Sequence, residues 1–121
     1  MTADRPLVAV IDDDESVRES LPDLLRECGF AVEAFASAEA FLVSECVGQT
    51  QCLLLDIAMP GMSGLDLQRE LRLRSRQIPI VFITALADAT VRPELFDVQC
   101  LVKPFSETAL LDAINAALNV N

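Results

Sequence analysis

The chain has 121 residues, of which 52% are hydrophobic and 23% are charged, and its formal net charge at pH 7 is −10. This length is typical of one domain around one hydrophobic core, so we expect a single domain over residues 1–121. The composition excludes a disordered chain, and no apolar run approaches the roughly 18 residues of a membrane span. The acidic charge repels nucleic-acid and membrane phosphates, so we expect direct binding to neither.

Neither a zinc site nor a secretory signal is indicated. The cysteines at positions 28, 46, 52 and 100 form no C-x-x-C pair, and the sequence contains no histidine. We therefore interpret the thiols as core residues. Residues 1–6 lack the apolar segment and cleavage site of a secretory signal, so we expect a cytoplasmic protein.

The first predicted elements are a strand and a helix. Residues 7–11 form an apolar run that is too short for a helix and typical of a buried strand. The next segment has apolar residues at helical spacing, and Gly29 follows at the position of a C-terminal cap. These apolar residues are Val17, Leu21, Leu24, Leu25 and Cys28. Pro22 lies among them, so we expect a local bend that costs about 3 kcal/mol.

An edge strand and a second helix are predicted next. Residues 31–35 alternate in part between apolar and polar side chains, with Glu33 between apolar neighbours. This pattern is typical of a strand at a half-covered sheet edge. Ser37 is the expected start of a helix that passes through Phe41 and Leu42 to Cys46.

A third strand and helix follow. Residues 52–55 form another short apolar run, which predicts a buried strand. Ser63 and Asp66 then form a capping-box-like start for a helix that should bury Leu67 and Leu71.

The last third of the chain contains two more strands and a final helix. Residues 80–83 and 100–102 are apolar runs of strand length. Between them, the apolar residues of segment 86–96 recur at no clear spacing, and Pro93 interrupts the segment. This predicts a short or poorly ordered helix. Ser106 caps the final helix. Its inward-facing residues are Leu110, Leu111, Ile114 and Leu118.

This order of elements predicts an α/β fold. Strands that alternate with helices form a parallel sheet covered on both faces and joined by right-handed crossovers. We expect a five-stranded, doubly wound (βα)5 domain with the flavodoxin-like strand order 2-1-3-4-5 and a short or disordered fourth helix.

Polar residues directly follow four of the predicted strands. They are Asp12, Asp13 and Asp14 after the first, Asp56 after the third, Thr84 after the fourth and Lys103 after the fifth. Parallel strands end at the same sheet edge, which is where open α/β sheets bind ligands. We therefore expect these side chains to converge.

The expected cluster of carboxylates requires a cation. Two carboxylates about 4 Å apart repel by roughly 4 kcal/mol at an effective dielectric constant near 20. Mg²⁺ is favoured, because this hard ion binds oxygen ligands, keeps several waters and shares its site with phosphate. One carboxylate could then attack a phosphoryl group while Lys103 and the Thr84 hydroxyl stabilise its oxygens, which would produce an aspartyl phosphate.

Four segments together resemble a known family. They are V-A-V-I-D-D-D-E, L-L-L-D-I-A-M-P-G-M-S-G-L, I-V-F-I-T-A and L-V-K-P-F. In this order and spacing they are similar to response-regulator receiver domains of two-component signalling, over nearly the whole chain. The stretch F-A-V-E-A-F-A-S-A-E-A-F-L is similar to receivers of nitrogen-fixation-type transcriptional regulators.

The resemblance implies a role for each polar residue. The implied metal ligands are Asp12, Asp13, Asp56 and the backbone carbonyl of Ala58. Asp56 is also implied as the phosphoacceptor, Thr84 as the switch hydroxyl and Lys103 as the cation that pairs with the phosphoryl group. Asp14 is instead expected to favour the start of the first helix electrostatically.

The resemblance also implies a phosphorylation switch and not an enzyme, apart from self-catalysed phosphotransfer and dephosphorylation. Since the chain has no histidine, the donor would be a histidine kinase, a histidine phosphotransfer protein or a small phosphodonor. Receivers often use the face of their fourth helix, fifth strand and fifth helix for partners or dimers, so a homodimer is among the expected assemblies. The Lys103–Pro104 bond is implied to be cis.

Two features depart from the family pattern. Cys100 stands where receivers usually have an aromatic residue, so we hypothesise that signalling runs through loop and helix shifts instead of aromatic coupling to Thr84. A phosphorylation-dependent partner affinity that Cys100→Phe leaves unchanged would count against a coupling role for this position. The segment between Thr84 and Lys103 is about one helical turn shorter than usual.

Three alternatives remain open from the residues alone. V-I-D-D-D-E-S-V also fits the start of haloacid-dehalogenase-type phosphatases, with Asp12 as nucleophile and Asp14 as acid and base, but no acidic pair follows Lys103 and Asp56 would be unexplained. A receiver-like module that signals only by binding is disfavoured by the full set of matching residues. A flavodoxin-like redox protein would need ring-stacking aromatics, and the chain has no Trp or Tyr.

Overall fold

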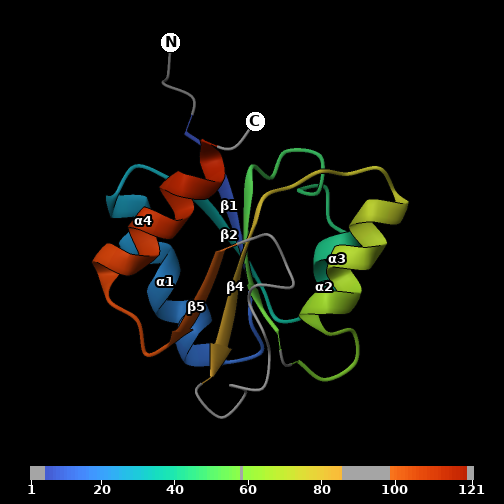
Figure 1. The fold of residues 1–121 in the computed structure, drawn as a ribbon, viewed down its shortest axis with the longest axis horizontal. Coiled ribbons are helices and arrows are strands. Elements are labelled where there is room, and N and C mark those ends of the chain that lie inside the picture. The colour runs from blue at the N-terminus through green and yellow to red at the C-terminus, as the bar shows by residue number, and fades with distance from the viewer. Residues whose placement is uncertain (1–4, 58, 86–98, 120–121) are drawn as a thin grey trace.

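The fold is built on one parallel sheet. The computed structural model describes residues 5–57, 59–85 and 99–119. Its elements are β1 (Leu7–Ile11), α1 (Glu15–Glu27), β2 (Ala31–Phe35), α2 (Ala38–Leu42), β3 (Cys52–Asp56), α3 (Gly64–Leu73), β4 (Ile80–Ala85), β5 (Gln99–Lys103) and α4 (Glu107–Leu118). The strand order is β2-β1-β3-β4-β5, and each neighbouring pair is parallel. Helices α1 and α4 cover one face of the sheet, and α2 and α3 cover the other (Figure 1).

The predicted α/β class, the flavodoxin-like topology and the strand order 2-1-3-4-5 are confirmed. The segment predicted as a short or disordered fourth helix, residues 86–96, lies outside the described residues. Among the helices that the structure describes, none combines the length and the hydropathy needed to cross a bilayer.

Two hydrophobic clusters hold the helices on the sheet. Successive residues of a strand point to opposite faces, so Leu54 packs toward α1 and α4 while Leu55 packs toward α2 and α3. Every residue of β3 is buried, because this central strand is covered on both faces. In β2 only Val32 is buried and Glu33 is exposed, which confirms the predicted edge strand. The central strand therefore presents Asp56 from a part of the fold that is buried on both faces.

Polar side chains cap the N-termini of the helices, and a further polar side chain, Ser44, accounts for the early end of α2. The N-caps are Asp14, Ser37, Ser63 and Ser106. The predicted extension of the second helix to Cys46 was wrong, because α2 ends at Leu42. The Ser44 hydroxyl donates to the Phe41 carbonyl at 2.7 Å and accepts from the Cys46 amide at 3.1 Å. These local bonds satisfy the backbone in a turn and so compete with a further helical turn.

The capping box that starts α3 predicts a pH dependence of stability. The Ser63 backbone donates to Asp66 Oδ2 at 3.1 Å, and the Asp66 backbone donates to Ser63 Oγ at 3.2 Å. The hydrogen bonds from the Ser63 backbone and hydroxyl lower the pKa of Asp66 from its usual 3.8. A carboxyl with a lowered folded-state pKa stabilises the fold above its ordinary pKa and loses that contribution as pH falls through the folded value.

We therefore expect Asp66→Ala to lower the free energy of unfolding near neutral pH and to matter less in acid. The difference between wild type and variant should stay constant above pH 5 and should shrink as the pH falls below 3.8, the usual pKa of this carboxyl. Urea unfolding followed by circular dichroism at a series of pH values measures it. A difference that is the same at pH 7 and at about pH 3 would show that the charge of Asp66 contributes nothing to the cap.

Candidate functional site

The predicted polar residues lie together at the carboxyl edge of the sheet. Asp12 directly follows β1, Asp56 ends β3 and Lys103 ends β5, while Thr84 lies one residue before the end of β4. Asp12, Asp56 and Thr84 are buried, with exposed fractions of 0%, 6% and 4%. The register places Ile83 beside Asp56, so Thr84 follows on the adjacent strand. Neighbouring parallel strands thus deliver all four residues to one edge, as predicted.

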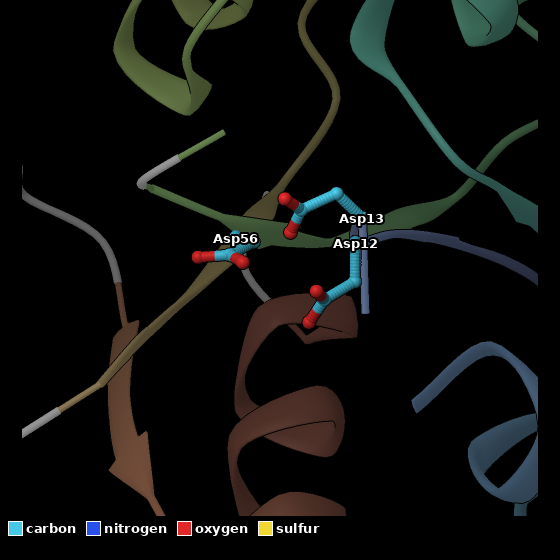
Figure 2. A group of neighbouring side chains, drawn as sticks. All are labelled: Asp12, Asp13 and Asp56. Atoms are coloured by element: carbon cyan, nitrogen blue, oxygen red, sulfur yellow. The ribbon is translucent and has the colours of Figure 1, made fainter. Parts of the chain in front are cut away.

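Three carboxylates form the centre of this site. Asp12, Asp13 and Asp56 each offer a carboxylate oxygen within 4.8 Å of the other two, and Figure 2 shows them gathered around one region of space. Asp12 and Asp56 are buried, whereas Asp13 is exposed, so water can reach one side of the cluster. Oxygen donors with an open, hydrated side suit Mg²⁺, which keeps several waters. The residues present therefore fit this ion. The further ligand implied by the sequence, the carbonyl of Ala58, lies outside the described residues.

Lys103 partly neutralises this acidic cluster. Its Nζ lies 3.0 Å from Asp12 Oδ2 and 3.8 Å from Asp56 Oδ2. The other oxygen of Asp12 accepts the backbone N–H of Asp14 at 2.9 Å. A fully buried carboxylate is costly unless its oxygens are paired, and these two contacts satisfy both oxygens of Asp12.

The pairing raises the pKa of Lys103. Burial lowers the pKa of its ammonium, but the hydrogen bond to Asp12 and the charges of Asp12, Asp56 and Asp14 outweigh this effect and raise the pKa above the usual 10.5. The ammonium is therefore charged at neutral pH. Because the folded-state pKa is raised, the stability that the pairing contributes is present below pH 10.5 and is lost as pH rises through the folded value.

Two contacts around the site were not predicted from the sequence. The Arg18 guanidinium donates to the backbone carbonyl of Asp12 at 3.0 Å. Its position one turn into α1 is a signal that could have indicated this contact. The Glu39 carboxylate on α2 accepts the backbone N–H of Met62 at 3.2 Å and so holds the loop that follows β3. No local pattern predicts this bond, because it joins residues 23 apart in the sequence.

Three smaller expectations concern residues near the three carboxylates in the sequence or in the sheet. Asp14 is the N-cap of α1 and accepts the backbone N–H of Ser16 at 2.9 Å, which confirms its expected role at the helix start. The Lys103–Pro104 peptide bond is cis, as the resemblance implied. Cys100 is the register partner of Phe82 and packs partly against the cluster beneath α2 and α3, where burial raises the pKa of its thiol. The hypothesis that signalling runs mainly through loop and helix shifts, instead of aromatic coupling at position 100, stays a prediction.

Comparison with known proteins identifies the family. Residues 8–115 match the response regulator receiver domain. The response regulator protein TodT of Pseudomonas putida is 42% identical over 117 residues, which cover 94% of this chain and 52% of TodT. The transcriptional regulatory protein FixJ of Azorhizobium caulinodans is 39% identical, with 92% of this chain and 54% of FixJ covered. The structure of the response regulator StyR matches with a TM-score of 0.87 and 49% identity, covering 98% of this chain and 61% of StyR.

These matches decide the family, whereas the interpretation as a receiver-like module that signals only by binding stays open. The expected similarity to nitrogen-fixation-type regulators is confirmed by FixJ, and the haloacid-dehalogenase alternative is set aside because the matched family extends over both Asp12 and Asp56. The chain spans about half the length of the curated relatives it matches. On the matched residues, on the fold and on these similarities, the chain belongs to the response regulator receiver domains of two-component systems.

Proposed function

We propose that this chain accepts a phosphoryl group on Asp56 and uses the change in charge to switch a partner or an output domain. The observation that carries the proposal is the cluster of Asp12, Asp13 and Asp56 around one region, with Lys103 paired to two of its members. A structural role alone does not account for three carboxylates held this close, because their mutual repulsion opposes folding.

The chemistry begins at the carboxylate of Asp56. One of its oxygens attacks the phosphorus of a phosphohistidine on another protein, the new O–P bond forms, and the P–N bond breaks as the imidazole leaves. In this proposal Lys103 and the Thr84 hydroxyl stabilise the phosphoryl oxygens. Mg²⁺ held by Asp12, Asp13 and Asp56, with the carbonyl of Ala58 as the further ligand, would supply positive charge for the same oxygens. The product is an aspartyl phosphate on a buried residue.

The partner of this reaction is a histidine kinase or a histidine phosphotransfer protein. None of the 121 residues is a histidine, so the phosphohistidine lies outside this sequence, and a small phosphodonor can replace it. Loss of the phosphoryl group returns the switch to its resting state, so the chain acts as a self-catalysing acceptor and not as an enzyme with external turnover. We place it in the cytoplasm, and a homodimer is among its proposed assemblies.

Phosphate uptake from a small donor tests this function. The purified chain is incubated with phosphoramidate, with Mg²⁺ or with a chelator, and its intact mass is measured. We expect a gain of one phosphoryl group with Mg²⁺ and little gain with the chelator. A chain that gains no mass while it remains folded would contradict the proposal, and sustained hydrolysis of the donor with the phosphoryl group on Asp12 would indicate a phosphatase.

A further inference from the structure

Gly64, the first residue of α3, lies directly against the backbone of the proposed phosphoacceptor. A Cβ built on Gly64 would lie 2.7 Å from the carbonyl oxygen of Asp56 and 3.0 Å from the Cα of Ile57. Real Cβ atoms essentially never lie as close as 2.7 Å to another atom, and 3.0 Å is tighter than most Cβ contacts, so any side chain at position 64 would force the first turn of α3 and the end of β3 apart.

The atoms that a side chain would meet cannot move cheaply. Both belong to the backbone, and the Ile57 N–H is bonded to the Ile83 carbonyl of β4 at 3.0 Å. The Ile57 carbonyl in turn accepts the N–H of Gly64 at 3.0 Å. Asp56 ends a strand in which every residue is buried. Displacement of this backbone would therefore disturb the ladder between β3 and β4 and would move the Asp56 side chain with it.

Helix α3 is also held against the sheet further along the same buried face. Leu67 and Leu71 are buried in the cluster beneath α2 and α3, and the Ser63–Asp66 capping box holds the first turn. The helix cannot slide outward without opening this packing. Gly64 is thus the point at which two rigid elements meet with no side chain between them.

We propose that Gly64 is a positioning residue for Asp56. Its missing side chain lets α3 lie against the strand end and so sets the distance between the Asp56 carboxylate and those of Asp12 and Asp13. This inference rests on the proposed function, since it assigns Gly64 a part in placing the acceptor. It goes beyond the tight turn for which glycines in such loops are usually selected.

The central variant is Gly64→Ala, which adds one methyl group. We expect phosphate uptake from phosphoramidate to slow by about tenfold or more, because displacing a reacting group by about 1 Å can cost on the order of a hundredfold in rate. The Mg²⁺ concentration for half-maximal rate should rise as well. Amide NMR signals of Asp56 and Ile57 should shift even without Mg²⁺ or donor, and that readout does not depend on activity.

Two controls separate positioning from loss of stability. Gly48→Ala adds the same methyl group where the nearest atom, in the Arg76 guanidinium, lies at an ordinary 3.6 Å, so uptake should be unchanged. Leu67→Ala leaves a cavity beneath the same helix and adds no atom against the Asp56 backbone. It should lower stability but leave the half-maximal Mg²⁺ concentration and the Asp56 and Ile57 signals near those of wild type. If Gly64→Ala is unfolded in buffer, all variants are compared in trimethylamine N-oxide, which favours the compact state.

The outcomes are distinct. Slower uptake with shifted Asp56 and Ile57 signals in Gly64→Ala alone supports the positioning role. Uptake by Gly64→Ala at the rate of wild type overturns this role. So does a Leu67→Ala protein in which the uptake rate falls and the half-maximal Mg²⁺ concentration rises as much as in Gly64→Ala. If wild type itself takes up no phosphate, the proposed function fails, and the NMR comparison still decides whether Gly64 sets the position of Asp56.

Discussion

An Asp56→Asn variant should take up no phosphate from phosphoramidate, while wild type takes up one group. The amide keeps the shape of the carboxylate but lacks the anionic oxygen that attacks phosphorus. Asp56 also has two like charges and one ammonium close by. Removal of its charge should therefore raise the free energy of unfolding without Mg²⁺ by about 1 kcal/mol. Intact-mass measurement and urea unfolding by circular dichroism check the two effects.

The control for this variant is Asp23→Asn, which makes the same chemical change at a side chain that is 81% exposed. Asp23 forms an exposed ion pair with Arg26 at 3.7 Å, and such surface pairs contribute little to stability. It should take up phosphate like wild type and unfold at the same urea concentration. Uptake by Asp56→Asn at the wild-type rate would mean that another residue is the acceptor. A fall in stability in Asp56→Asn would mean that its favourable contacts outweigh the repulsion within the cluster.

Replacement of Lys103 by methionine should have the second largest effect, and it should act on both rate and stability. The ammonium lies 3.0 Å from a fully buried carboxylate oxygen of Asp12, and its loss leaves that charge without its cation. We expect the free energy of unfolding to fall by about 2 kcal/mol in the absence of Mg²⁺. Phosphate uptake should slow by about a hundredfold, as when an enzyme loses one stabilising donor for developing negative charge.

Added Mg²⁺ distinguishes the electrostatic explanation from a simple loss of packing. If Lys103 stabilises the fold by neutralising the cluster, Mg²⁺ should restore part of the lost stability in Lys103→Met and should raise its melting temperature more than that of wild type. Lys103→Arg keeps the charge with a different shape, so its stability without Mg²⁺ should lie between that of Lys103→Met and that of wild type. A Lys103→Met protein as stable as wild type at every Mg²⁺ concentration would contradict this account of the pairing.

The topology and the site positions were predictable because both follow from short-range sequence order. Each apolar run of strand length is followed directly by the residue that reaches the site, and parallel strands bring their carboxyl ends to one edge. Asp12, Asp56 and Lys103 could therefore be named together although they are distant in sequence. The capping box of Ser63 and Asp66 was likewise local enough to be recognised.

The features that were not predicted depend on individual contacts that the spacing of apolar residues does not indicate. Helix α2 ends early because Ser44 bonds its neighbours, and apolar periodicity does not report such a competition. Helix α1 continues from Glu15 to Glu27 with Pro22 buried inside it, and the bend expected at Pro22 stays a prediction. The contact of Gly64 with Asp56 is also invisible in the sequence, because a glycine there is equally compatible with an ordinary turn.

The identity of the phosphorylated residue is the most direct test of the central claim. Wild-type protein is phosphorylated with phosphoramidate and Mg²⁺, the acyl phosphate is reduced with borohydride, and the modified residue is located by peptide mass spectrometry. We predict that the reduced residue is Asp56 alone and that no modified peptide is recovered from Asp56→Asn. Modification of Asp12 or Asp13, with Asp56 unmodified, would contradict the assignment of Asp56 as the acceptor.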